Sequence, residues 1–191
     1  MAANARSILF GNFSTGESDA AGFAYYPGNT AASSRSGDVW LKSTLSYNTS
    51  PSASNYGGMV IVHEIGHAIG LAHPAEYNAS ETEPVTYAKH AEYYEDSRQY
   101  TVMSYFSESN TGGAFSGAYA SSPQLDDIAA AQLAYGANMS TRTGDTVYGF
   151  NANAGRDWFS ASSASSKLVF AVWDAGGNRS EEHTSELQSR Q

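Results

Sequence analysis

Residues 60–74 read Val-Ile-Val-His63-Glu64-Ile-Gly-His67-Ala-Ile-Gly70-Leu-Ala-His73-Pro74, and the rest of the chain is interpreted around this stretch. His63 and His67 are four residues apart, so on a helix their Cβ atoms lie about 5–6 Å apart on one face and the side chains can share a metal ion. Glu64 follows His63 directly, which suits a general base that acts on a metal-bound water. The stretch therefore predicts a helix that carries a metal centre.

The end of this helix predicts the third ligand. Gly70 can adopt a positive φ without a steric penalty, and Pro74 prevents the helix from resuming, so the chain should turn back and bring His73 under the helix end. Three neutral imidazoles and one open position are typical of catalytic zinc, whereas structural zinc has four protein ligands, usually with cysteine among them. The chain has no cysteine. We therefore expect a catalytic Zn²⁺ bound by His63, His67 and His73.

A second segment, Thr101-Val-Met103-Ser-Tyr105-Phe106, supplies the methionine turn that accompanies the pattern His-Glu-x-x-His-x-x-Gly-x-x-His. The two segments together resemble the metzincins. With residues 125–130 (Leu-Asp-Asp-Ile-Ala-Ala) and 141–150 (Thr-Arg-Thr-Gly-Asp-Thr-Val-Tyr-Gly-Phe), the chain resembles one branch of them, the serralysins, which are secreted bacterial metalloproteases. The resemblance covers most of residues 5 to 178.

This resemblance implies a fold and a division of the chain. The fold class is α+β: a metzincin or zincin-like catalytic domain with a twisted mixed sheet, an active-site helix, a methionine turn and a C-terminal helix, followed by the start of a β-roll. We expect residues 1–141 to form part of the catalytic domain and residues 142–178 to begin the β-roll. A complete protease of this kind has a long helix and two strands before residue 5, and a full β-roll and an export signal at the other end.

The last residues, 179–191, begin Arg-Ser-Glu-Glu-His-Thr-Ser-Glu-Leu-Gln. This run resembles the in-frame translation of a sequencing-library adapter. We therefore expect a foreign tail that takes no part in the fold.

Local patterns predict the elements around the metal helix. Apolar alternation predicts strands over 5–13, 22–27 and 38–43, with Val39 and Leu41 on one face of the third. Pro27 closes the second strand, as expected of a sheet edge, and the resemblance implies that the substrate backbone binds along residues 22–26.

A later helix should have Ser122 as its N-cap and Pro123 as its first residue, and should end at Gly136. Asp126 and Asp127 would complement its dipole. Four of its residues share a face: Ile128, Ala131, Gln132 and Tyr135.

The site residues then have expected roles. Glu64 is the general base, and the serralysin resemblance implies that Tyr105 is a further zinc ligand that can swing away to stabilise the oxyanion. Met103 is expected to form an apolar floor beneath the zinc. His90, alone on a loop, is expected to be solvated.

The resemblance also implies a structural Ca²⁺ between the catalytic domain and the β-roll. Six residues match its ligand positions: Arg142, Gly144, Thr146, Asp174, Gly176 and Gly177. Calcium prefers hard oxygen ligands of this kind. The alternative is that residues 141–146 are an ordinary turn before a strand. The sequence has no Gly-Gly-x-Gly-x-Asp repeat of the β-roll.

Composition limits the partners. The formal net charge of −9 argues against binding to nucleic acid or anionic membranes, and no apolar run approaches the ~20 residues of a membrane span. We therefore expect neither nucleic-acid binding nor membrane insertion. The resemblance implies a monomer that acts on polypeptides and is secreted into the extracellular medium.

The function predicted from the sequence is zinc-dependent endopeptidase activity through a zinc-activated water. Two alternatives remain. The chain is a catalytically incompetent fragment that binds zinc, or it is a calcium-binding structural module.

Overall fold

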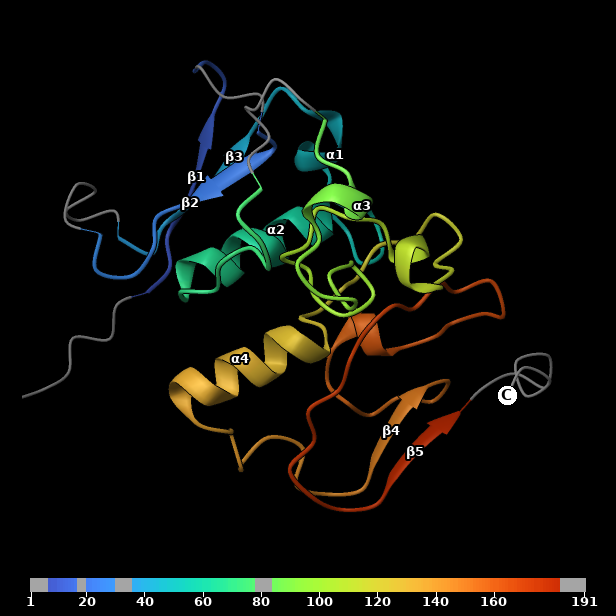
Figure 1. The fold of residues 1–191 in the computed structure, drawn as a ribbon. Coiled ribbons are helices and arrows are strands. Elements are labelled where there is room, and N and C mark those ends of the chain that lie inside the picture. Colours follow the sequence, from blue (N-terminus) through green and yellow to red (C-terminus); the bar gives the residue numbers. More distant parts are fainter. Residues whose placement is uncertain (1–6, 17–19, 30–35, 78–83, 183–191) are drawn as a thin grey trace, which may run out of the picture.

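A computed structural model describes residues 7–16, 20–29, 36–77 and 84–182 of the 191-residue chain. In Figure 1, helix α2 runs between a small sheet on one side and helix α4 on the other, and the pair β4–β5 lies beyond α4. The elements follow the order β1 (Phe10–Phe13), β2 (Gly22–Ala24), β3 (Val39–Lys42), α1 (Ser46–Thr49), α2 (Tyr56–Ala68), α3 (Tyr87–His90), η2 (Glu108–Thr111), α4 (Leu125–Tyr135), β4 (Thr146–Gly149), η3 (Asp157–Phe159) and β5 (Arg179–Glu182).

The first sheet is mixed and has the order β1-β3-β2. β3 pairs in parallel with β1 and antiparallel with β2, so β2 is an edge strand among the described residues. Val39 and Leu41 point from β3 into the core, where they pack with Met59 and Val60 of α2. The mixed α+β class and the inward face of the third strand are confirmed.

The observed strands are shorter than predicted. β1 begins at Phe10, and residues 5 and 6 of the predicted strand lie outside the described part of the chain. β2 ends at Ala24, because the chain turns at Pro27, where the N–H of Asn29 donates to the carbonyl of Tyr26. The sequence does not predict the four-residue helices α1 and α3, because a single helical turn is too short to show a periodic pattern.

Helix α2 is closed at both ends by local hydrogen bonds. Asn55 is the N-cap, and its side-chain oxygen accepts from the N–H of Gly58 at 2.8 Å. At the other end Gly70 has φ +99°, its N–H donates to His67, and the N–H of Leu71 donates to Gly66. These two bonds form a Schellman motif, so the predicted helix end at Gly70 is confirmed.

Helix α4 begins later than predicted. Its N-cap is Gln124 instead of Ser122, because the carboxylate of Asp127 accepts the N–H of Gln124 at 2.7 Å and fixes the first turn there. Gly136 ends the helix with φ +82°, as predicted.

The C-terminal region has a separate small core. β4 pairs in parallel with β5, and Tyr148, Ala154 and Phe159 form the buried cluster beside them. β5 consists of Arg179–Glu182, the first residues of the predicted foreign tail, so these four take part in the fold. The domain boundaries, and the foreign origin of 179–191, stay predictions.

Candidate metal centre

The three histidines of the sequence pattern meet at one point. Nε2 of His73 lies 3.1 Å from Nε2 of His67 and 3.3 Å from Nε2 of His63. One turn of α2 brings the side chains of His63 and His67 together, and the reversal of the chain at Gly70 brings His73 back toward them. The group could hold one metal ion.

Hydrogen bonds fix the tautomers of two of these rings. Nδ1 of His63 lies 2.8 Å from the carbonyl oxygen of Val102, and Nδ1 of His67 lies 2.8 Å from that of Leu71. A carbonyl only accepts, so each Nδ1 carries the proton and each Nε2 keeps a free lone pair toward the shared point.

Burial favours the neutral form that a metal needs. It lowers the pKa of His63 to about 4 and that of His73 to about 3, and it lowers the pKa of His67 as well. Neutral imidazoles with convergent lone pairs match the ligand chemistry of zinc, so the residues present fit the ion that the sequence predicts.

Glu64 lies beside the histidines and faces the edge strand. Its side chain is only 5% exposed, its Oε2 atom has no hydrogen-bond partner among the described residues, and burial raises its pKa to about 8. Gly22 of β2 is close enough that a Cβ there would lie 3.1 Å from Oε1 of Glu64. The carboxyl group of Glu64 therefore lies next to β2, whose outer edge is unpaired among the described residues and can accept another strand.

Residues 101–106 form the predicted turn beneath α2. Asp127 holds this turn by accepting from the hydroxyl of Thr101 at 2.5 Å and from the N–H of Val102 at 2.9 Å. Met103 is buried, and its sulfur occupies the space that a side chain at Gly66 would need. The turn thus packs under the metal-binding helix and presents the Val102 carbonyl to His63.

Tyr105 follows this turn at the edge of the metal centre. Its ring centroid is 4.5 Å from that of His73 and 6.2 Å from that of His63, and the side chain is 38% exposed. Burial and the nearby charge of Glu64 raise its pKa, so the phenol keeps its proton near neutral pH and can donate a hydrogen bond.

Several residues near the centre are not identified by the sequence pattern. The hydroxyl of Tyr26 lies 3.3 Å from Nδ1 of His67, Tyr77 stacks on His73, and Asp96 and Asp127 anchor the turn from opposite sides. The sequence interpretation gives Asp127 a role in the helix dipole only. Tyr77 is close to His73 along the chain, but the partners of the other three are 8 to 41 residues away, so no local spacing indicates those contacts.

The six residues of the predicted calcium site also lie together, but their groups are already engaged. Asp174 accepts from the hydroxyl of Tyr148 at 2.8 Å and from the N–H of Gly176 at 3.1 Å, and the carbonyl of Gly144 accepts from the hydroxyl of Thr146 at 3.0 Å. The guanidinium of Arg142 donates to the carbonyl of Trp173. Gly177, at φ +74°, packs its backbone against Gly144.

Arg179 adds a positive charge to this region. Its Nη1 donates to the carbonyl of Asp174 at 3.2 Å. Asp174 is the one carboxylate among the six predicted ligands. The guanidinium of Arg179 lies beside it and offsets its negative charge. The cation of Arg179 beside this carboxylate disfavours a calcium ion in this chain, and the calcium site stays a prediction of the sequence.

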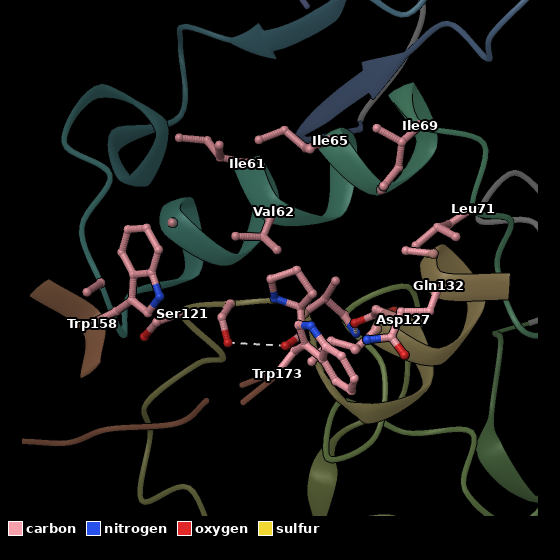
Figure 2. A pocket seen from close by; sticks show the side chains of 18 of the residues that line it. Ile61, Val62, Ile65, Ile69, Leu71, Ser121, Asp127, Gln132, Trp158 and Trp173 are labelled. Atoms are coloured by element: carbon pink, nitrogen blue, oxygen red, sulfur yellow. Dashed lines mark hydrogen bonds between the residues drawn. The ribbon is translucent and has the colours of Figure 1, made fainter. Parts of the chain in front are cut away.

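A large apolar cavity is separate from the metal centre. It has a volume of about 690 Å³, lies between α2 and α4, and is lined mainly by apolar side chains such as Ile61, Ile65 and Leu71 (Figure 2). The predicted face of α4, from Ile128 to Tyr135, lines it, but none of the three histidines does. No helix among the described residues is both long enough and apolar enough to cross a membrane.

Two sequence families match the chain. Residues 2–116 match the family described as Metallo-peptidase family M12, and residues 137–189 match the one described as Peptidase M10 serralysin C terminal. The first match includes the three histidines, Glu64 and the turn.

Individual proteins match over most of the chain. It is 55% identical over 177 residues to the metalloprotease AprA of Pseudomonas entomophila, a match that covers 90% of this chain and 36% of that protein. Serralysin C of Dickeya chrysanthemi is 53% identical over 160 residues (82% and 32%), and a serralysin of Proteus mirabilis is 51% identical over 175 residues (90% and 35%). The chain thus spans about a third of the length of these relatives.

Proposed function

The chain belongs to the serralysin-type metallopeptidases, and we propose that it carries the active site of a secreted, zinc-dependent endopeptidase. The observation that carries this proposal is the convergence of three Nε2 lone pairs beside Glu64, whose Oε2 atom has no hydrogen-bond partner among the described residues. A structural metal site would need a fourth protein ligand, usually a cysteine, whereas among the described residues His63, His67 and His73 gather with no further His, Cys, Asp or Glu ligand in their group.

Zinc bound there would act as a Lewis acid that activates a water molecule and polarises the scissile carbonyl. Glu64 would take the proton of that water and later return it to the leaving amine, because it follows His63 on α2 and its Oε2 atom has no hydrogen-bond partner among the described residues. Tyr105 donates its phenolic hydrogen to the carbonyl oxygen as negative charge develops on it.

The edge strand provides a place for the substrate. β2 is paired on one side only, and Gly22 places it against Glu64. An extended polypeptide can add to such an edge through main-chain hydrogen bonds, which would carry its scissile bond past the metal centre.

The decisive test is Glu64→Gln, assayed with a quenched peptide and with a measurement of zinc content. The variant should lose about 10²- to 10⁴-fold in turnover and retain its zinc, because the amide cannot accept the proton while the three ligands are unchanged. Glu92→Gln, at an exposed glutamate, is the matched control and should behave as the wild type. Unchanged turnover in Glu64→Gln would remove Glu64 from the mechanism.

The same assay separates the alternatives. Cleavage that a hydroxamate chelator inhibits supports the endopeptidase, whereas zinc uptake without turnover identifies a zinc-binding chain that lacks activity. Stability that depends on calcium alone, without zinc uptake, would support the calcium-binding module.

Secretion and the monomeric state are part of the proposal and rest on the family resemblance. Activity in the culture medium of cells that express the whole gene, and the elution volume of the purified protein, would test them.

A further inference from the structure

Tyr77 packs against both the third histidine and Tyr105. It is 4% exposed, and its ring stacks on that of His73 with a centroid distance of 5.7 Å and an interplanar angle of 18°. The ring of Tyr105 lies against the same side chain, 4.9 Å away between centroids. Tyr77 therefore contacts two of the residues assigned to the metal centre at once.

The hydroxyl of Tyr77 is anchored below these rings. It donates to Oδ1 of Asp96 at 3.3 Å and accepts the backbone N–H of Tyr105 at 3.2 Å. Asp96 is fully buried, and the same oxygen accepts from the hydroxyl of Ser104 at 2.6 Å. The phenol of Tyr77 thus connects a buried carboxylate to the backbone of Tyr105.

His73 differs from the other two histidines in how its ring is oriented. His63 and His67 each donate Nδ1–H to a carbonyl, but Nδ1 of His73 has no hydrogen bond to the residues that the structure describes. The orientation of this ring therefore depends on packing, and Tyr77 supplies a nearly parallel face. A ligand without its own outer hydrogen bond is sensitive to the residue that packs against it.

We propose that Tyr77, anchored by Asp96, is a positioning residue that fixes His73 and the backbone of Tyr105 relative to the metal. With the backbone held, Tyr105 can move toward or away from the metal only by rotation of its own side chain. The inference rests on the proposed function, since it assumes that the three histidines bind zinc.

The test compares Tyr77→Phe with Tyr87→Phe in the full chain. Tyr87 also packs on Phe106, with ring centroids 5.5 Å apart, but its hydroxyl donates to the carbonyl of Tyr94 instead of the Asp96 network. Zinc affinity is measured by competition with a chromophoric chelator, and the ligand geometry by the visible spectrum of the cobalt-substituted protein. Melting of the metal-free proteins reports on the fold.

Tyr77→Phe keeps the aromatic face but releases it from Asp96, so zinc binding should weaken, by less than the about 10- to 100-fold that removal of an outer partner of a metal ligand costs, and the cobalt spectrum should change. Asp96→Asn, which keeps the volume but weakens the anchor, should change both in the same direction. Tyr87→Phe should change neither.

Two results would overturn the inference and can be told apart. In the first, Tyr77→Phe and Tyr87→Phe both bind zinc as tightly as the wild type and show the wild-type cobalt spectrum. Tyr77 then has no positioning role, although the metal centre stands. If the wild type takes up no zinc, the proposed function fails, and this inference fails with it.

Discussion

The predicted zinc ligands and the predicted calcium ligands both come together in the folded chain, but they differ in what their ligand atoms do there. At the zinc site the backbone engages Nδ1 of His63 and His67, so the Nε2 atoms remain available. At the calcium site the oxygens of Asp174 and Gly144 already accept hydrogen bonds, and Arg179 lies beside them.

This comparison shows that proximity of predicted ligands does not by itself make a site. A metal needs lone pairs that the fold leaves free, and it needs a local charge that favours a cation. The first region leaves three imidazole nitrogens facing one point, whereas in the second Arg179 places a cation beside the one carboxylate. The four predictions below test this difference.

The largest effect is expected for His73→Ala. Two remaining histidines hold zinc far less tightly than three, so the loss of affinity should exceed the about 10- to 100-fold that removal of an outer partner costs. Peptidase activity should disappear as well. Chelator competition measures the affinity, and full zinc occupancy at nanomolar free metal would refute His73 as the third ligand.

Tyr105→Phe should affect turnover without affecting the metal. The loss of one donor to a developing oxyanion typically lowers kcat about 100-fold or more, and the three histidines are untouched. Steady-state kinetics and zinc analysis provide the measurement. An effect on KM alone would count against the role of Tyr105 in the transition state.

The metal-free protein should become less stable as the pH falls from about 6.5 toward 4. The pKa of His63 is lowered from 6.5 to about 4 and that of His73 to about 3, so the unfolded chain binds these protons first. The stability that neutral histidines contribute is therefore complete above pH 6.5 and is lost through this window.

Glu64 acts in the opposite sense, because its pKa is raised from 4.5 to about 8, and the raised pKa values of Asp96, Asp126 and Asp127 oppose the histidines as well. These carboxyl groups offset part of the loss. Urea unfolding of the metal-free protein at a series of pH values measures the balance. A stability that is constant between pH 6.5 and 4 would contradict the burial of these histidines in neutral form.

The smallest effect concerns calcium. The chain with Arg179 should melt at nearly the same temperature in calcium and in chelator, whereas Arg179→Asp, by replacing a cation with a carboxylate, should gain a calcium-dependent increase. A ligand at a hundred times its Kd contributes about 2.7 kcal/mol to the free energy of unfolding. A large calcium-dependent increase in the chain with Arg179 would refute both the assignment of this region and the predicted foreign origin of Arg179.

Local sequence signals predicted the elements that short-range chemistry controls. The His63–His67 spacing, the Gly70 helix end and the buried face of β3 depend on residues within a few positions, so they follow from the sequence. The predicted N-cap of α4, Ser122, was wrong by two residues. The observed N-cap is Gln124, because Asp127 at the third helical position accepts its N–H.

The sequence by itself determined which residues can bind a metal, because ligand type and helical spacing are local properties. Only the tertiary structure decided which of those ligands remain free and what holds them. Val102 orients His63 from 39 residues away, Tyr77 packs against both His73 and Tyr105, and Arg179 occupies the surroundings of Asp174. Such contacts depend on how distant segments pack, and no pattern within a single segment specifies them.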